Sequence, residues 1–265
     1  MESLHISALY LHPLKSAAAL AVEELPYDER GPIFDRHWMV VDHNGKFRSQ
    51  RHTPKMCLIV PELQAGVLAL AAPSMPRIEV GQPSELREVT VWADTLNAGD
   101  CGDAVADWLT TFLGVSSRLV VLTPQSERLV DRHYAGNDET VGFADGFPSL
   151  IATQASLDDL NQHMSSAVDM RRFRPNIVIS GSTPYAEDQW QRLRIGELEF
   201  DLVKPCSRCI IPSIDPDTGE KQLVVNQALM THRRRGRETY FGQNAVHRGT
   251  GSLRVGQAVE VISEK

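Results

Sequence analysis

The sequence lacks any run approaching the roughly 20 apolar residues that a membrane-spanning helix needs. It also lacks a secretory signal, because residues 1–7 are acidic and polar where a signal has a basic start followed by an apolar stretch. We therefore expect a cytoplasmic protein with no membrane partner.

Cysteine is scarce, with four residues in a chain of 265: Cys57, Cys101, Cys206 and Cys209. These are too few to form a disulfide framework in a chain of this length, which indicates a reducing compartment. No second Cys-x-x-Cys or close histidine pair is present to complete a four-ligand structural zinc site. The nine histidines show no ligand-like spacing, so we assign none of them to a metal.

The sequence also has no excess of basic over acidic residues. The formal net charge of −7 argues against a nucleic acid or an anionic membrane surface as the main partner. The run Arg233–Arg237 is a local exception. It indicates either a solvated helix end, with arginines near the C-terminal dipole, or a docking patch for an acidic electron donor.

The sequence predicts mainly β-strands in the N-terminal half of the chain. Residues 37–41 and 46–51 flank Asn44-Gly45, which is the strongest short-range signal of a β-hairpin. Further strands are predicted by short apolar runs between Pro- and Gly-bearing turns, at residues 6–10, 57–60, 67–71 and 88–91. We expect a small antiparallel domain resembling a barrel or a sandwich.

A helix is predicted over residues 103–113, since its apolar side chains share one face and Gly114 follows. A strand is expected at residues 118–122. The polar, Gly-bearing segment 130–145 is the best candidate for a connection between two halves. We place the domains at residues 1–125 and 126–265.

The second half mixes strands with helices. Ser156 with Asp159 resembles a capping box and predicts a helix start. Strands are predicted at residues 150–153, 176–180, 193–195, 198–203 and 259–262. The expected fold class is α+β and strand-rich, with a β-barrel-like N-terminal domain packed on a C-terminal mixed α/β domain.

The most informative stretch is Lys204-Pro-Cys206-Ser-Arg208-Cys209-Ile-Ile-Pro212, which is followed by the turn Asp215–Gly219. A helix is not expected there, so thioredoxin-like redox use is disfavoured. Three interpretations remain open on chemistry alone. In the first, one thiolate is a ligand of a soft metal. In the second, a cysteine is a nucleophile or a persulfide carrier. In the third, both thiols are buried and unreactive.

Several motifs together resemble a known family. They are Phe173–Ile179, Tyr185–Trp190, Ile195-Gly196, the Cys206–Cys209 loop with Asp215–Gly219, and upstream Tyr10–Ser16 and Phe34–Trp38. The pattern resembles the molybdenum cofactor sulfurase C-terminal (MOSC) domain, preceded by its N-terminal β-barrel domain. Within that superfamily it is most similar to the mitochondrial amidoxime-reducing component and its bacterial YcbX-like relatives.

The resemblance implies a site for a molybdenum–molybdopterin cofactor. Cys209 corresponds to the metal ligand and catalytic thiolate, whereas Cys206 does not. The positions that correspond to the family's cofactor-binding residues are Lys15, Ser16, Arg36, Asp145, Gly146, Phe147, Pro148, Arg174, Ser207, Arg208 and Asn244. Arginine and lysine suit the terminal phosphate of such a cofactor. The alternative for Arg36 and Arg174 is participation in ordinary ion pairs.

The resemblance further implies a molybdenum-dependent oxidoreductase that reduces small N-hydroxylated compounds, such as amidoximes, hydroxylamines and N-hydroxylated bases, by removing oxygen at molybdenum. The alternative is a sulfur (persulfide) carrier or a cofactor storage or delivery protein. The chain ends without the ferredoxin domain of many YcbX-like relatives. A separate ferredoxin-, flavin- or b-type cytochrome-containing donor is therefore expected. Ala17-Ala18-Ala19 stands where the family usually has a glycine.

Overall fold

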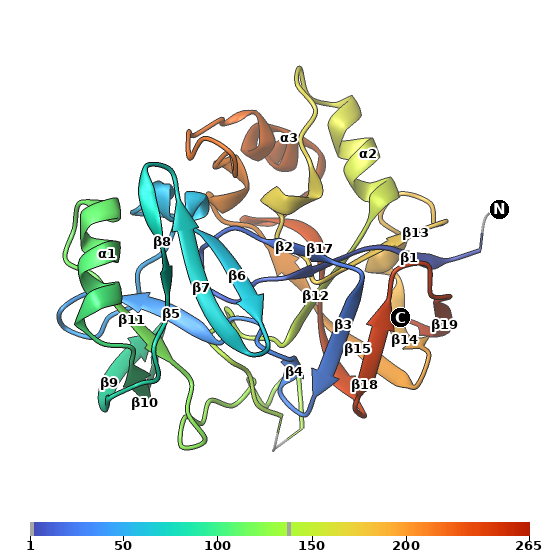
Figure 1. The fold of residues 1–265 in the computed structure, drawn as a ribbon. Coiled ribbons are helices and arrows are strands. Elements are labelled where there is room, and N and C mark those ends of the chain that lie inside the picture. The colour runs from blue at the N-terminus through green and yellow to red at the C-terminus, as the bar shows by residue number, and fades with distance from the viewer. Residues whose placement is uncertain (1–2, 137–138) are drawn as a thin grey trace.

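A nine-stranded sheet forms the largest part of the structure, a computed structural model that describes residues 3–136 and 139–265 (Figure 1). Its strands follow the order β19 (Glu260–Glu264), β14 (Trp190–Ile195), β15 (Leu198–Ser207), β17 (Glu238–Arg248), β12 (Ser149–Thr153), β13 (Ile177–Ser180), β1 (His5–Leu11) and β2 (Leu20–Val22), and β16 (Arg234–Arg235) pairs with β17. Strands β12 and β13 are parallel, and the other strand pairs of the described residues are antiparallel.

Three smaller sheets complete the described architecture. They consist of β5 (Trp38–Val41), β11 (Arg118–Val121), β10 (Asp94–Asp100) and β9 (Glu85–Val91); of β18 (Gly251–Arg254), β3 (Glu24–Asp28) and β4 (Gly31–Pro32); and of β6 (Val60–Gln64), β7 (Val67–Ala72) and β8 (Met75–Glu79). The α-helices are α1 (Asp103–Leu113), α2 (Gln154–Gln162) and α3 (Val224–His232), and the 3₁₀ helices are η1 (Pro54–Leu58), η2 (Met170–Arg172), η3 (Ala186–Asp188) and η4 (Ile211–Ser213).

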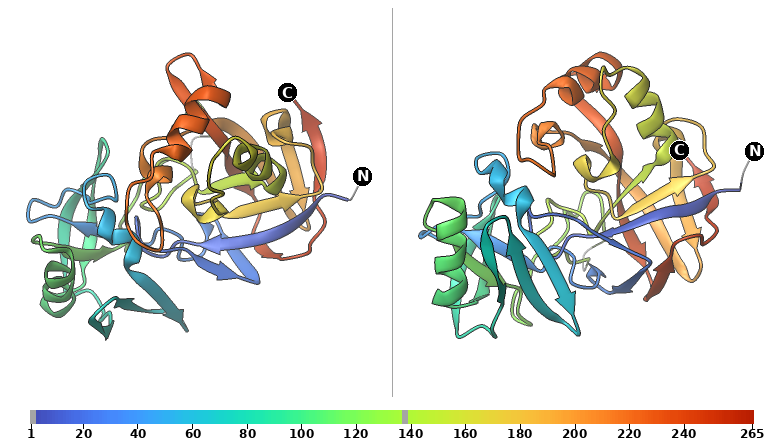
Figure 2. Two further views of the ribbon diagram at one scale, coloured as in Figure 1. Left: turned by 90° about the horizontal axis from the view of Figure 1, so that it is seen from above. Right: turned by 45° about the horizontal axis from the view of Figure 1, so that its top comes forward.

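The large sheet is the middle of three layers. Helices α2 and α3 cover one face, where Leu160 and Leu229 pack with Phe241 of β17. The sheet of β18, β3 and β4 covers the other face, where Leu25 and Leu253 join the core. Figure 2 shows the two helices above the sheet and β1 running along it. The strand-rich α+β prediction is confirmed.

The first half contains its own core between α1 and two open sheets, the β5–β11–β10–β9 sheet and the β6–β7–β8 sheet. Helix α1 spans the predicted residues because Val105, Leu109 and Phe112 are buried on one face. It ends where Gly114 adopts a left-handed conformation (φ 72°). Within residues 3–136 the sheets do not close into a barrel.

The pairing of β1 differs from our expectation. The strand predicted at residues 6–10 exists, but it pairs with β13 and β2 rather than with strands of the small domain. The short strand β3 likewise pairs with β18, and β4 pairs with β3. The strands between His5 and Pro32 therefore complete the sheets of the second half.

Three local predictions were wrong in part. Residues 54–58 form η1 because Pro54 starts a helical turn, so the strand predicted at 57–60 begins at Val60 as β6. The Asn44-Gly45 turn is present, with Arg48 N bonded to Val40 O at 2.8 Å, but residues 46–51 form bridges rather than a second strand. The helix predicted to start at Ser156 begins earlier, as α2 at Gln154. Its N-cap is Thr153, whose side chain accepts a hydrogen bond from Ser156 N.

The predicted N-terminal stretch 1–7 and the predicted connection 130–145 include residues 1, 2, 137 and 138, which lie outside the described residues. The division at residues 125 and 126 stays a prediction. Among the helices of the described residues, none combines the length and the apolar character needed to cross a membrane.

Candidate functional site

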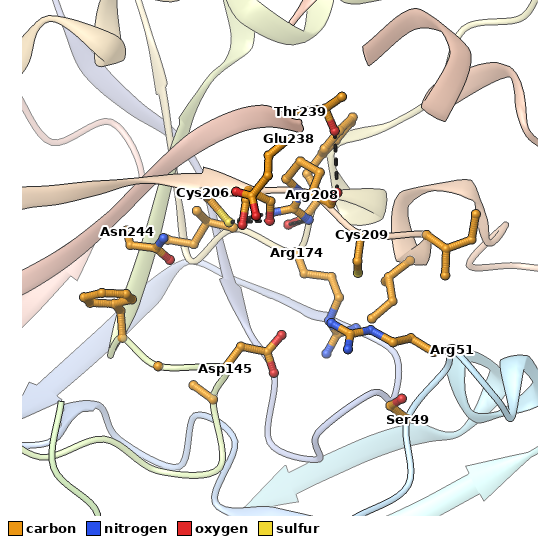
Figure 3. A pocket seen from close by; sticks show the side chains of 18 of the residues that line it. Ser49, Arg51, Asp145, Arg174, Cys206, Arg208, Cys209, Glu238, Thr239 and Asn244 are labelled. Carbon is orange, nitrogen blue, oxygen red and sulfur yellow. Dashed lines mark hydrogen bonds between the residues drawn. The ribbon is translucent and has the colours of Figure 1, made fainter. Parts of the chain in front are cut away.

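A cavity of about 720 Å³ lies between the two halves, and eleven of the twelve predicted site residues line it (Figure 3). These residues are Lys15, Ser16, Arg36, Asp145, Gly146, Phe147, Arg174, Ser207, Arg208, Cys209 and Asn244. Pro148 does not line the cavity. It packs against Gly31, where an added Cβ would come within 2.8 Å of the Pro148 Cβ. The structure thus brings together residues from distant segments.

Strand β15 brings the Cys-x-x-Cys pair to the cavity. The strand runs to Ser207, beyond the predicted end at residue 203, because β17 continues to pair with it as far as Tyr240. Cys206 is therefore a strand residue, and its sulfur accepts a hydrogen bond from Arg208 Nη1 at 3.0 Å. Cys209 follows the strand end and lines the cavity, and its backbone carbonyl accepts from Asn226. The two thiols have different surroundings.

Three of the predicted cofactor-binding residues have a left-handed backbone. The φ angles are 67° at Ser16, 45° at Arg36 and 56° at Arg174. Such conformations cost on the order of 1–3 kcal/mol in residues other than glycine and cluster at functional sites. Hydrogen bonds hold them in place, among them Arg36 N to His12 O at 2.7 Å and Gln50 Nε2 to Ser16 O at 2.9 Å. The surrounding structure therefore imposes these conformations.

Lys15 and Asp145 form an ion pair in the cavity wall. Lys15 Nζ donates to Asp145 Oδ1 at 2.5 Å and to Phe143 O at 2.7 Å. Burial lowers the pKa of Lys15, which the charge of Asp145 opposes. Burial would raise the pKa of Asp145, but Lys15, Arg51 and Arg36 outweigh it and hold that pKa well below its usual range. Asp145 is thus a carboxylate facing the cavity.

The Arg36 guanidinium is largely used within the protein. It bonds to the buried Asp35 carboxylate, to Asn176 Oδ1 at 3.0 Å and to Arg174 O at 3.1 Å. The ion-pair alternative therefore holds for Arg36. Burial raises the pKa of Asp35 although Arg36 opposes the shift. Since Arg36 binds the Arg174 carbonyl, it also positions Arg174.

Arg174 differs from Arg36 because it has a free donor. Its Nη1 donates to Ala17 O at 2.5 Å, while its buried Nη2 has no partner. Burial and then the charge of Arg36 lower the pKa of Arg174 to about 9. Arg51 Nε and Arg208 Nε are also buried without a partner. Buried donors of this kind are costly unless a ligand completes them.

The charge of the cavity fits an anionic ligand. The basic side chains that line it are Lys15, Arg36, Arg51, Arg174, Lys204, Arg208, Arg234 and Arg237, and the acidic ones are Asp145 and Glu238. This local excess occurs in a chain of net charge −7. Guanidinium groups with unfilled donors suit a phosphate, and Cys209 offers a soft ligand in the same cavity. The residues therefore fit a phosphorylated cofactor that holds a soft-ligand metal.

No group of three or more histidine, cysteine, aspartate or glutamate side chains that could hold a metal occurs in the part of the chain that the structure describes. A metal bound by Cys209 would therefore take its other ligands from outside these side chains. A cofactor that brings its own sulfur ligands meets that requirement.

Sequence reasoning missed several lining residues, notably Ser49, Arg51, Phe47 and Trp92. Arg51 lies 4.5 Å from the Trp92 ring centroid, and Trp92 Nε1 donates to Asp145 Oδ1 at 3.3 Å. Trp92 has a φ of 58° in the two-residue turn between β9 and β10, which is unusual for a bulky side chain. No local sequence signal pointed to this turn as part of a site.

Comparison with known proteins identifies the class. A family model described as the MOSC N-terminal beta barrel domain matches residues 3–116, and the MOSC domain model matches residues 138–260. The chain belongs to the family of proteins that combine these two domains.

Particular relatives cover most of the chain. It is 32% identical to mitochondrial amidoxime-reducing component 1 of Danio rerio, over 97% of this chain and 85% of the relative. It is 30% identical to the human protein of that name, over 98% and 83%. It is also 30% identical to human molybdenum cofactor sulfurase, over 91% of this chain but 30% of the sulfurase. The chain thus spans less than a third of the sulfurases, and its relatives associate it with the molybdenum cofactor.

Proposed function

We propose that this protein is a molybdenum-cofactor-dependent oxidoreductase that reduces small N-hydroxylated compounds. The observation that carries the proposal is that Cys209 shares one cavity with the buried, unpartnered donors of Arg51, Arg174 and Arg208. The relatives named amidoxime-reducing component support the same reaction class.

The chain's own residues would bind and orient the cofactor. Cys209 would supply the protein's thiolate to the metal, and Arg174 and Arg51 would offer donors to the phosphate. Asp145 would accept hydrogen bonds from ring nitrogens of the cofactor, since its carboxylate stays ionised. When bound, the cofactor supplies two-electron redox chemistry that no side chain in the cavity has.

The proposed reaction breaks the N–O bond of the substrate. An amidoxime takes up two electrons and two protons, and it leaves as an amidine and one water. The electrons come one at a time from a separate protein donor containing a ferredoxin cluster, a flavin or a b-type haem. We also propose a cytoplasmic location, for which the free state of all four cysteines is the supporting observation. Cell fractionation tests it.

Metal and pterin analysis of the purified protein tests the function. We expect stoichiometric molybdenum and reduction of benzamidoxime by an artificial donor. Cys209→Ala should lose both, whereas Cys206→Ala should retain most of both, since the Cys206 sulfur is already bonded to Arg208. Full activity in the Cys209→Ala protein would exclude the assignment of the ligand.

The second candidate is a persulfide carrier or a protein that stores or delivers the cofactor. The similarity to molybdenum cofactor sulfurases and the accessible Cys209 favour it. Metal-free protein with sulfane sulfur on Cys209 would support the carrier, and bound cofactor without turnover would support storage.

A further inference from the structure

A second cavity of about 470 Å³ lies beside the first. Both cavities are lined by Arg174 and Ile211, so they meet at these two side chains. The wall comes from both halves of the protein: residues 17–19, 50, 57, 58, 60 and 71–73 of the first, and residues 171, 172, 174, 211, 214, 216 and 217 of the second. Arg174 apart, none of the residues proposed above to hold the cofactor lines this cavity.

The second cavity differs from the first in charge. Arg171 bonds to Asp217 through two contacts of 2.9 Å and also to Asp169. Arg172 bonds to Asp215 at 2.8 Å. Among the charged side chains of its wall, these arginines are neutralised, and Arg174 faces the junction with the first cavity. The second cavity therefore offers an anion fewer unpaired basic side chains than the first cavity does.

The rest of the wall is mainly small and apolar. Its apolar members are Ala17, Ala18, Ala19, Leu58, Val60, Ala71, Ala72, Pro73, Ile211, Ile214 and Pro216. The alanines at 17–19 leave room that longer side chains would fill. At its edge Val60 is 44% exposed, an unusual position for a branched apolar side chain. The volume is in the range of small-molecule pockets.

We propose that the second cavity binds the apolar group of the substrate, while the N-hydroxylated end lies in the first cavity near Cys209. This inference rests on the function proposed above. Ile211 follows Cys209 by two residues and lines both cavities, so a substrate that passes Ile211 reaches from one to the other. The substrate class is then an N-hydroxylated compound that carries an extended alkyl or aryl group, such as a long-chain amidoxime.

A homologous series of alkyl amidoximes, from acetamidoxime to octanamidoxime, tests the proposal. Each is titrated calorimetrically into the cofactor-loaded protein without an electron donor, so that nothing turns over. Burial of one methylene strengthens binding by about fourfold, so the dissociation constant should fall steeply with chain length. In Val60→Asp, which places a charge at the edge of the cavity, and in Val60→Trp, which fills it, the dependence on chain length should flatten while acetamidoxime binds as before.

Val67→Asp is the matched control, because Val67 is 41% exposed in the adjacent strand and lines neither cavity. It should keep the wild-type dependence on chain length. Equal affinity for all chain lengths in the wild type, or equal effects of Val60→Asp and Val67→Asp, would overturn the inference. A steep dependence without reduction once a donor is added would instead refute the proposed function and leave the cavity assignment intact.

Discussion

Lys15 Nζ and the Asp145 carboxylate form a hydrogen-bonded ion pair of 2.5 Å across 130 positions of the chain, and the two partners differ in exposure. The side chain of Lys15 is 6% exposed and that of Asp145 is 63% exposed. Removal of either partner therefore has unequal consequences, because only Asp145 can be solvated when it is left alone.

We expect Asp145→Asn to destabilise the fold by about 1–3 kcal/mol, since it leaves a buried ammonium group without its counter-charge. Lys15→Met should cost less, because the remaining carboxylate reaches water in the cavity. Urea denaturation of the two variants measures the difference. A larger loss for Lys15→Met would show that the ammonium group is better solvated than the structure indicates.

Trp92 should control how firmly the cavity holds its ligand. Its ring lies against Arg51 and its Nε1 bonds to Asp145. Trp92→Ala removes a cation–π contact of about 1 kcal/mol, so cofactor retention should fall by about fivefold. Trp92→Phe keeps an aromatic ring and should lose less. Molybdenum retained after dialysis is the measurement, and equal retention in Trp92→Ala and wild type would contradict the role.

His37 should make the folded state sensitive to acid. Burial lowers its pKa to about 4, whereas an unfolded chain titrates near 6.5. Between these values the unfolded chain binds a proton that the folded protein does not. Stability from His37 is therefore complete above pH 6.5 and is lost as the pH falls toward 4.

His37→Phe keeps a ring beside Phe34 and Trp38 but cannot titrate. The melting temperature of this variant should fall less than that of wild type between pH 6.5 and pH 4.5. Parallel curves for the two proteins would show that His37 is not responsible.

The arginines of the run 233–237 are not equivalent. Arg233 and Arg235 bond to Asp188 at 2.6 and 2.5 Å, so neither is free. Arg234 and Arg237 are exposed and line the cavity. We expect that Arg234→Gln with Arg237→Gln slows reduction by an acidic donor protein and weakens its salt dependence.

Stopped-flow reduction at two or more salt concentrations measures this effect. Arg254→Gln, an exposed arginine on β18 that lines neither cavity, is the control. Identical rates for the double variant and wild type would exclude this surface as the docking site.

Local patterns predicted the elements that depend on local interactions. Helix α1 has the predicted bounds because its buried face and the stop at Gly114 are encoded within twelve residues. The pairing of β1 with β13 joins residues about 170 positions apart, and no local pattern specifies such a partner. The range of helix α3 was not predicted, although a helix end was one interpretation of the run Arg233–Arg237, and α3 does end at His232 with Arg233 as its C-cap. The buried Val225, Ala228 and Leu229 have helical spacing, but the helix has only nine residues and no side-chain cap at Leu223, so the local signal is short.

The candidate site shows the same division. The Cys-x-x-Cys spacing alone does not show whether Cys206 or Cys209 is the metal ligand. The resemblance to the family indicated Cys209. The structure adds that Cys206 is a strand residue bonded to Arg208, while Cys209 follows the strand end. Arg51 and Trp92 reach the cavity from loops whose positions depend on the packing of the first half, so their part in the site could not be inferred from sequence.

The place of β1 also affects the order of folding. This strand is synthesised first and can pair early with β2, but its edge facing β13 stays open until residues 177–180 have been made. Val259 N bonds to Leu4 O at 2.9 Å, so the start of β1 lies beside the last strands (Figure 1). In a circular permutant that begins after Pro32, the strands β1, β2, β3 and β4 would be synthesised last. They would then pair with sheets that have already formed.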